Sequence, residues 1–600
     1  MPKYSVQNLT VDNVLGYIKN KSIAIPEMQR PFVWENDQIR DLIDSLYNGF
    51  PVGYLIVWQN PDTTDKNGER TLGKQIMIDG QQRITALMSA LVGQPVLDKK
   101  YQFKRRIISF NPYLAAQDEP CFEVQSAAIL KDKHWIKDIS VLFAPDYDSY
   151  TVIDDFCAEN EDMDKKVLHK LLSRVVEIKY APIGVIELNK ELKIDQVTEI
   201  FIRINSKGTS LTQADFVMST IAADEKYGGN MLRKAIDYFC HTFEEGHFLE
   251  TIKYDETFVA SPYYDHIAWA SKLGDKLFKF SFDDVLRIAF MSQYYRGKMA
   301  NLTDLLHGRN FEKRTYEDEI MQDTFERLTM GVNDVFNHYI YTQFIDCLRG
   351  AGFVHPSLLR SRMTLDFAYM LFIRLYREKM DMTHIFHYVQ RWYVMSILTG
   401  RYSSSPETRM DEDLRGIREK SFEIYYEQVM ANISDTFWQV TLVQKLETSS
   451  ISAPAFSTFL AAQCKSVDNS FLGDGLKVPN LLNSGDIHHV FPKQYLKDNG
   501  HDVVTEYNQV ANYALLSKPV NIAIGKKAPS VYLGAILESI EKGEPSDYTN
   551  FRSVEALYAN LDANALPHDL VSMTKDDYSV FLATRRALMA QKIRRYFESL

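Results

Sequence analysis

The spacing of apolar residues near the start of the chain predicts a helix followed by a buried strand. Asn36 is a suitable N-cap, and the apolar residues after it recur three and four positions apart, as on the buried face of a helix. These apolar positions are Ile39, Leu42, Ile43, Leu46 and Tyr47. Gly49 and Pro51 end the predicted helix, and the continuous apolar run at 54–58 predicts a buried strand.

A second strand and helix are predicted at residues 75–93. Ile76 and Ile78 indicate a short strand, and Asp79 with Gly80 makes a turn before a helix that begins near Gln81. The apolar stripe of this helix consists of Ile84, Leu87, Met88 and Leu91. The first backbone N–H groups of a helix lack partners and its dipole is positive at that end, so an anion such as a nucleotide phosphate is favoured there.

Asp79 allows two interpretations of this turn. Its carboxylate repels a phosphate unless a magnesium ion lies between them or the carboxylate binds a ribose hydroxyl. Alternatively, Asp79 caps the helix and Arg83 pairs with it, and the motif is only structural. Farther along the chain, Asn205 and Lys207 lie in a predicted turn from which both side chains can reach a bound anion.

The middle of the chain, from about 226 to 450, shows helical stripes and no catalytic pattern. Segments 365–376 and 385–398 carry apolar and aromatic residues at helical spacing, which predicts helices of a buried core. The histidines of this region show no grouping typical of a metal site. Two polar stretches, at 403–416 and 447–455, are predicted to be loops or hinges.

Two adjacent histidines, His488 and His489, lie on a short apolar run that ends at 491–492, and Asn512 and Asn521 follow. Successive side chains of a flat strand face opposite sides, so the histidines converge on one site only if the chain bends near the Phe-Pro step. A neutral imidazole accepts a proton from water near pH 7, and a second imidazole with an oxygen ligand holds a divalent cation. This combination is typical of metal-assisted phosphodiester hydrolysis.

Composition bounds the architecture and the compartment. A chain of 600 residues with 45% hydrophobic residues is long and apolar enough for several domains with their own cores. Its five cysteines are scattered without a CxxC pair, which indicates reduced thiols and neither a disulfide framework nor a zinc ribbon. The N-terminal segment resembles no signal peptide, and no apolar run approaches the roughly 20 residues of a membrane span. We therefore predict a soluble cytoplasmic protein.

A net charge of −11 argues against non-specific coating of DNA through a global positive field. Local contacts remain open, because several lysines surround the paired histidines. We predict that Lys493, Lys518 and Lys526 contact DNA. The last predicted helix is also basic, either as a solvated face or as a contact to phosphate. Its basic residues are Arg585, Arg586, Lys592, Arg594 and Arg595.

The order His-His-x-x-Pro, then Asn, eight residues and Asn, resembles the ββα-metal fold of HNH endonucleases. The resemblance implies that His489 is the general base, that Asn512 orients the loop carrying the base, and that His488 and Asn521 bind a divalent metal, Mg²⁺ or Mn²⁺. Asp486 is a further candidate metal ligand. Many such sites carry Asp at the position of His488, which leaves the metal preference open.

Three motifs in order resemble the N-terminal domain of GmrSD-type restriction proteins, a ParB-like fold that binds and hydrolyses nucleoside triphosphates. They are IPxxQRxxxW at 25–34, DGQQR at 79–83 and FxxINxxGxxL at 201–211. The resemblance implies a site for GTP or ATP. Its implied nucleotide-binding residues are Arg30, Asp79, Gln81, Gln82, Arg83, Asn205 and Lys207.

Together these resemblances predict an α+β multidomain protein similar to fused GmrSD-like type IV restriction endonucleases. The expected domains are a ParB-like nucleotide-binding domain at 1–225, a helical connecting domain at 226–450 and an HNH domain embedded in helices at 451–600. The implied function is NTP-regulated, metal-dependent cleavage of modified double-stranded phage DNA. The alternative is a nucleotide-gated DNA-binding sensor or regulator with little nuclease activity. The oligomeric state stays open, a homodimer included.

Overall fold

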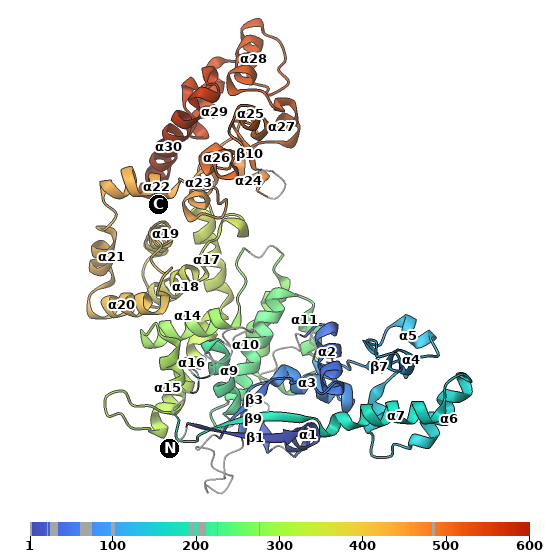
Figure 1. The fold of residues 1–600 in the computed structure, drawn as a ribbon. Coiled ribbons are helices and arrows are strands. Elements are labelled where there is room, and N and C mark those ends of the chain that lie inside the picture. The colour runs from blue at the N-terminus through green and yellow to red at the C-terminus, as the bar shows by residue number, and fades with distance from the viewer. Residues whose placement is uncertain are drawn as a thin grey trace. The chain divides into compact units, whose positions relative to one another are not determined.

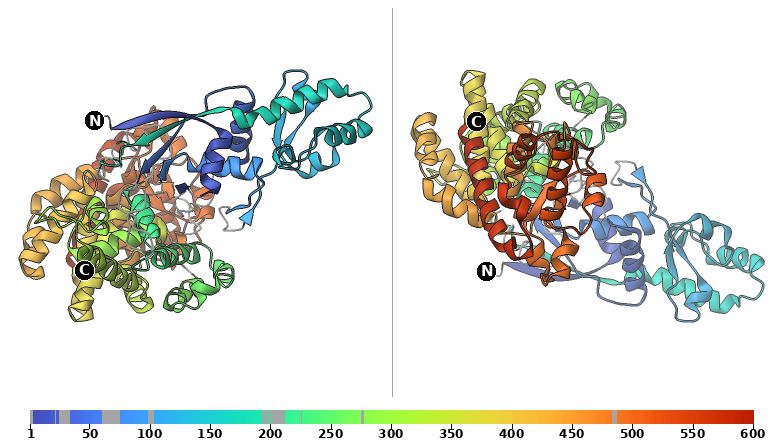
Figure 2. Two further views of the ribbon diagram at one scale, coloured as in Figure 1. Left: turned by 90° about the horizontal axis from the view of Figure 1, so that it is seen from below. Right: turned by 90° about the horizontal axis from the view of Figure 1, so that it is seen from above.

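The computed structural model of the chain divides into two compact units, Met1–Arg233 and Lys234–Leu600. It describes residues 3–20, 22–24, 34–59, 75–97, 103–192, 197, 200, 212–224, 226–274, 277–482 and 487–600. Figures 1 and 2 draw the N-terminal unit in blue to turquoise and the C-terminal unit in green to red. Helices dominate and the sheets are small, which confirms the expected α+β class. None of the described helices has the length and apolar character needed to cross a membrane.

A five-stranded sheet organises the N-terminal unit. Its order is β1 (Tyr4–Thr10), β9 (Pro182–Leu188), β3 (Tyr54–Gln59), β4 (Gln75–Asp79) and β2 (Ile23–Ala24). Strand β3 runs parallel to β9 and antiparallel to β4. Along β3, Leu55 and Val57 join one buried cluster while Ile56 and Trp58 join another. The predicted buried strand is therefore confirmed, and its unbroken apolar run reflects burial on both faces of the sheet.

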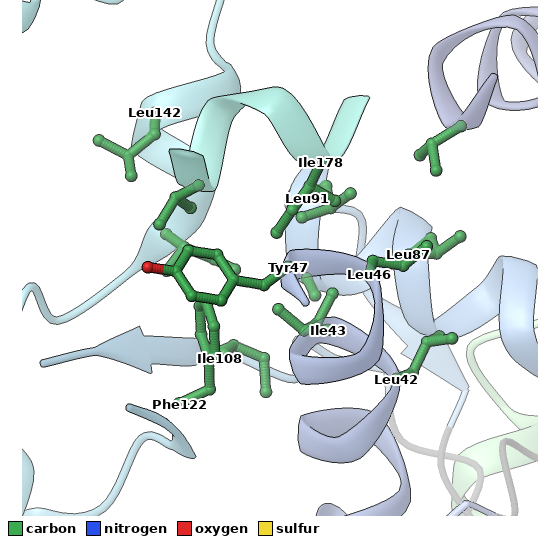
Figure 3. Packing of buried hydrophobic residues seen from close by; sticks show 14 of the residues in the cluster. Leu42, Ile43, Leu46, Tyr47, Leu87, Leu91, Ile108, Phe122, Leu142 and Ile178 are labelled. Atoms are coloured by element: carbon green, nitrogen blue, oxygen red, sulfur yellow. The ribbon is translucent and has the colours of Figure 1, made fainter. Parts of the chain in front are cut away.

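Helices α1 (Val11–Lys19), α2 (Asn36–Tyr47) and α3 (Gln81–Leu91) contribute to the larger cluster, which Figure 3 shows around Tyr47. All five predicted apolar positions of α2 are buried. Its N-cap is Glu35, so the expected cap at Asn36 is wrong by one position. The backbone N–H of Glu35 donates to Gln38 Oε1 at 2.9 Å, which satisfies a donor at the start of the helix.

The aromatic end of α2 links the sheet layer to a small substructure made of residues 103–180. The Tyr47 ring packs edge-on against Phe122 with centroids 5.1 Å apart, and the Arg174 guanidinium lies 4.0 Å from its centroid. The elements of this substructure are β7 (Ile108–Phe110), β8 (Phe122–Val124), α4 (Pro112–Ala115), α5 (Ala127–Lys131), α6 (Ser149–Glu159) and α7 (Lys165–Val176). Helix α9 (Gln213–Ala223) follows β9 later in the chain.

Long helices build the first part of the C-terminal unit, as the apolar stripes predict. Helix α10 (Gly229–Glu244) contains the division at Arg233, and most of it belongs to this unit. The helices that follow include α14 (Phe282–Tyr294), α16 (Asp318–Val335), α17 (His338–Gly350), α18 (Arg362–Arg377), α19 (Met382–Thr399), α20 (Pro406–Glu419), α21 (Phe422–Met430) and α23 (Pro454–Lys465). The predicted loop at 403–416 is wrong, because most of it belongs to α20. Pro406 stands in the first turn, where proline does not interrupt helical hydrogen bonding.

The last part of the C-terminal unit combines one short hairpin with surrounding helices. What we call the hairpin is the two-stranded antiparallel sheet of β10 (Ile487–His489) and β11 (Tyr513–Leu515), whose strands are joined through the helical segment 490–512 and not by a tight turn. The helices are α25 (Lys493–Asp498), α26 (Val504–Tyr507), α27 (Lys518–Ile524), α28 (Pro529–Lys542), α29 (Val554–Ala563) and α30 (Tyr578–Glu598). The prediction for this part of the chain is a ββα-metal domain embedded in helices, and the structure shows two short paired strands among helices. The ββα-metal fold here and the ParB-like fold of the N-terminal unit stay predictions.

Candidate functional site

The paired histidines lie in a strand that pairs antiparallel with a second strand and is followed by a helix. His488 lies opposite Ala514 and His489 opposite Tyr513 across the hairpin. After β11 the chain turns at Ser517, the N-cap of α27, and this helix carries Asn521. Asn512 bonds to the residues directly after the histidines, whereas Asn521 lies in the helix that follows β11.

The strand β10 continues through both histidines, so their side chains point to opposite faces of the hairpin. The expected bend comes after the pair, where Val490 and Phe491 enter the core and Pro492 becomes the N-cap of α25. The two imidazoles therefore cannot act as two ligands on one face. The predicted convergence of the two histidines through a bend at the pair is therefore wrong, and it is His489 whose imidazole contacts the loop before β11.

Asn512 fastens this loop to the chain that follows His489. Its side chain is fully buried, and Oδ1 accepts from the Phe491 backbone N–H at 2.8 Å. Nδ2 donates to the carbonyl oxygens of Phe491 and Tyr507 at 3.1 and 3.2 Å. Its own backbone carbonyl accepts from the Val490 N–H at 2.8 Å. These bonds hold residues 507–512 beside His489, where the HNH resemblance would have the orienting asparagine.

His489 is partly buried between aromatic rings and an asparagine. Its Nε2 lies 2.9 Å from Asn508 Oδ1, and its ring packs edge-on against Tyr513 with centroids 5.1 Å apart. Burial lowers the pKa of His489, the hydrogen bond to Asn508 raises it, and the positive charge of Lys493 lowers it again; the net direction is downward. A lowered pKa favours the neutral imidazole at pH 7, which is the form that accepts a proton.

Sequence reasoning missed Asn508 and Tyr507, because neither belongs to the spaced motif. The centroids of the Tyr507 and His489 rings lie 6.4 Å apart. The ammonium groups of Lys493 and Lys497 lie 5.1 and 5.2 Å from the centroid of the Tyr507 ring. Two cations thus gather over a ring beside the candidate base. The sequence feature that could have drawn attention to Asn508 is its position four residues before Asn512.

The predicted DNA-contact lysines are all exposed in this substructure. Lys493 begins α25 and lies over Tyr507, close to the candidate base. Lys518 begins α27, the helix of Asn521, whereas Lys526 follows that helix with its Nζ 4.0 Å from Asp498 Oδ2. Lys493 is therefore the one of the three that the described contacts connect to His489.

The basic residues of the last helix are largely engaged within the protein. Arg585 is buried, and its Nη1 donates to the Ala511 carbonyl at 2.8 Å. Burial lowers the pKa of Arg585 to about 9. Lys592 Nζ lies 2.6 Å from Asp468 Oδ2, and Arg594 Nη1 lies 2.8 Å from Asp435 Oδ1. Helix α30 therefore supports the loop that Asn512 fastens, and Arg585 has no exposed face for phosphate.

The metal ligands of the HNH resemblance are only partly described. Asp486 lies outside the described residues, while His488 and Asn521 lie on β10 and α27. Among the residues that the structure does describe, no three or more His, Cys, Asp or Glu side chains gather in a group that could hold a metal ion. An imidazole, an amide oxygen and a carboxylate form a donor set compatible with Mn²⁺ or Mg²⁺.

In the N-terminal unit, the DGQQR motif joins β4 to α3 as predicted. Gly80 is the N-cap of α3 in the left-handed region, with φ +97°. A Cβ at Gly80 would lie 2.2 Å from Leu55 Cδ2, so the turn requires glycine for space as well as for φ. No side chain caps the start of α3, and its first N–H groups point out of the helix beside Gln81 and Gln82.

Asp79 and Arg83 pair with each other at this turn. Arg83 Nη2 lies 3.0 Å from Asp79 Oδ2, and Nη1 donates to the carbonyls of Val52 and Tyr54 at 3.1 and 2.9 Å. The structural alternative is correct about this pair but wrong about the cap, which is Gly80. Gln81 Nε2 donates back to the Met77 carbonyl at 3.3 Å.

The remaining predicted nucleotide-binding residues are Arg30, Asn205 and Lys207, and all three lie outside the described residues. The turn at Gly80 is thus the described part of this candidate site.

Comparison with known proteins relates the N-terminal unit to restriction enzymes. Residues 11–222, about a third of the chain, match the family model described as the N-terminal domain of the GmrSD restriction endonuclease. The match spans β4, α3 and the three motifs that carry the resemblance. An uncharacterized protein of Methanocaldococcus jannaschii is 23% identical over 97% of this chain and 98% of its own length. The similarity to that protein therefore runs through both units.

Proposed function

We propose that this protein is a metal-dependent DNA endonuclease of the HNH type, with its cleavage site on β10, β11 and α27. The observation that carries the proposal is His489, partly buried with a lowered pKa beside a loop that the buried Asn512 fastens. The N-terminal match to a restriction endonuclease family supports DNA as the substrate. The proposal therefore rests on both units, on the His489 site for the reaction and on the N-terminal family match for the substrate.

In the proposed reaction His489 removes a proton from water, and the water oxygen bonds to the scissile phosphorus. The bond from phosphorus to one deoxyribose oxygen breaks, and that oxygen leaves with a proton from solvent. Asn512 keeps the base and its loop in place. A Mg²⁺ or Mn²⁺ ion would stabilise the negative charge that develops on the phosphate and the leaving oxygen. Asn521 and Asp486 are its candidate ligands, and His488 would join them only with a turn of the chain at that residue, because β10 puts the His488 side chain on the face opposite His489.

The direct test is plasmid cleavage by His489→Ala with Mg²⁺ or Mn²⁺. We expect cleavage to be lost while the circular dichroism spectrum and the unfolding midpoint stay close to those of the wild type. The matched control is His568→Ala, because His568 lies in the same part of the chain, is exposed and pairs with Asp562 at 2.8 Å. Normal cleavage by His489→Ala would rule out the proposed base.

We further propose that GTP or ATP binds at the start of α3 and regulates cleavage of modified phage DNA. The uncapped helix start, the adjacent Asp79 and Arg83, and the family match support this proposal. To admit a phosphate, Arg83 would exchange part of its pairing with Asp79 for the ligand, and the Asp79 carboxylate would face the accompanying Mg²⁺.

Calorimetric titration with GTP and ATP tests the nucleotide site. We expect Asp79→Asn and Arg83→Ala to weaken binding at least tenfold, while Arg40→Ala, which removes a pairing with Asp41 on α2, leaves it unchanged.

Cleavage of a panel of modified and unmodified phage DNAs, with and without nucleotide, then identifies the substrate. Binding of nucleotide and DNA without any cleavage would favour a nucleotide-gated DNA sensor.

A further inference from the structure

We infer that Asn508 is a positioning residue that fixes the tautomer of His489, an inference that rests on the proposed nuclease function. The Asn508 Oδ1 lies 2.9 Å from His489 Nε2. An amide oxygen only accepts hydrogen bonds, so Nε2 carries the proton of the neutral ring and Nδ1 carries the lone pair. Nδ1 is therefore the atom that takes the proton from water.

The other contacts of His489 do not fix which ring nitrogen carries the proton, so the hydrogen bond to Asn508 does. Tyr507 and Tyr513 meet the imidazole through their rings, and Lys493 acts on it through its charge. Within the part of the chain that the structure describes, Nδ1 makes no hydrogen bond. The nitrogen that has to accept the proton is thus the one that keeps its lone pair unengaged among the described residues.

Asn508 is itself held from both sides. Its backbone N–H donates to the Val504 carbonyl at 3.1 Å, and the carbonyl of the preceding Tyr507 accepts from Asn512 Nδ2 at 3.2 Å. On the other side, the Arg586 guanidinium donates to Gln509 Oε1 at 2.9 Å. These bonds limit the movement of the loop, so the amide oxygen is presented to Nε2 before the substrate arrives.

The uncharged amide also suits a site that receives a phosphate. A carboxylate at this position would orient the ring equally well, but it would add negative charge beside a negatively charged substrate. The ammonium groups of Lys493 and Lys497 lie over the ring of Tyr507, the residue before Asn508. Asn508 therefore orients the base without opposing the attraction of the lysines for DNA.

The first test is single-turnover cleavage by Asn508→Leu, which keeps a similar volume and removes the acceptor. We expect the cleavage rate to fall about ten- to a hundredfold while DNA affinity stays within about twofold, as for other residues that orient a reacting group. Asn499→Leu is the control, because the Asn499 side chain lies in the same part of the chain and makes its hydrogen bond elsewhere, with Nδ2 donating to the Tyr495 carbonyl at 2.8 Å. Unchanged cleavage by Asn508→Leu would overturn the inference.

The second test reads the tautomer directly and needs no activity. Nitrogen NMR of the full chain with labelled histidine, with His489 assigned by comparison with His489→Ala, should show a protonated Nε2 in the wild type and in Asn508→Asp. Asn508→Leu should show loss of this single tautomer. A protonated Nδ1 in the wild type would overturn the inference. Absence of cleavage by a wild-type protein with the expected tautomer would refute the nuclease function alone.

Discussion

At the scale of single residues, Asn512 and Asn508 have different roles around His489. Asn512 is buried and makes its bonds to the backbone, so it determines where the loop lies. Asn508 is less buried and bonds to the imidazole, so it determines how the base is presented. Substitution of these two residues is therefore expected to separate stability from catalysis.

Replacing Asn512 should destabilise the protein. Asn512→Ala leaves the Phe491 N–H and carbonyl and the Tyr507 carbonyl without their partner in a buried position, at a cost of about 1–3 kcal/mol for each unsatisfied group before relaxation. We expect a loss of about 3 kcal/mol in the free energy of unfolding of the C-terminal unit, measured with urea. A loss below about 1 kcal/mol, similar to that of Asn499→Ala, would show that the loop is held by other contacts.

Two glycines of the N-terminal unit should respond to alanine with opposite signs. Gly80→Ala forces a side chain into the left-handed region and against Leu55, so we expect a loss of about 1–3 kcal/mol. Gly16 lies inside α1, and a Cβ there meets nothing within 4 Å. Gly16→Ala should therefore gain about 0.5–1 kcal/mol. Thermal unfolding of the two variants measures both, and equal signs would contradict the turn geometry.

At the scale of elements, helix α30 connects the loop beside His489 to the long helices of the same unit. Near its start, Tyr578 Oη donates to the Glu506 carbonyl at 2.9 Å, and Arg585 bonds to Ala511. Near its end, Tyr596 Oη donates to the Ala351 carbonyl at 2.6 Å. Helix α30 is basic in sequence, but its role here is structural. Most of its basic side chains bond to other parts of the protein, so they do not form one solvent-exposed basic face.

The packing of α18 against α14 buries an acid whose protonation should affect stability. Asp366 is fully buried, and within the described residues neither of its side-chain oxygens has a hydrogen-bond partner. Arg287 Nε lies 3.9 Å away. Burial raises the pKa of Asp366 well above its usual value, and Asp284 raises it further while Arg287 lowers it. The folded state therefore binds this proton more tightly than the unfolded chain does.

It follows that the contribution of Asp366 is favourable at low pH and is lost as pH rises from about 4 through its folded-state pKa. Asp366→Asn should remove this dependence, so the variant should gain stability relative to the wild type as pH rises toward 7. Urea unfolding at pH 5, 6 and 7 measures the difference. Asp435→Asn, at a position 73% exposed, serves as the control. A constant difference between Asp366→Asn and wild type would contradict the assignment.

At the scale of the whole molecule, the chain consists of two compact units with separate candidate sites. The N-terminal unit has its own sheet and buried clusters, and it carries the Gly80 turn. The C-terminal unit carries β10, β11 and α27. Because each unit contains its own core, each has the means to unfold cooperatively on its own.

Scanning calorimetry of the full chain should therefore show two transitions. A ligand that binds only the folded form stabilises the unit that holds its site. We expect GTP or ATP to raise one transition and Mn²⁺ to raise the other, with the nucleotide effect lost in Asp79→Asn and the metal effect lost in Asn521→Ala. A single transition that responds to both ligands would contradict independent units.

Helices and strands with strong apolar spacing could be predicted from the sequence, because the signal is local. The buried face of α2, the stripe of α3 and the helices α18 and α19 follow from residues within a few positions of one another. Prediction failed where a neighbouring contact decides between two local choices. Glu35 replaces Asn36 as N-cap because its backbone pairs with Gln38, and Pro406 begins a helix in a segment whose composition indicates a loop.

The residue types of the candidate sites were also present in the sequence, as His488, His489, Asn512 and the DGQQR turn. Their partners were not, because these partners come together only when the chain folds. Asn508 meets His489 across 19 positions, and Arg585 meets Ala511 across 74. Spacing along a chain specifies which face of an element a side chain occupies, whereas the path of the backbone between elements decides which side chains share a hydrogen bond.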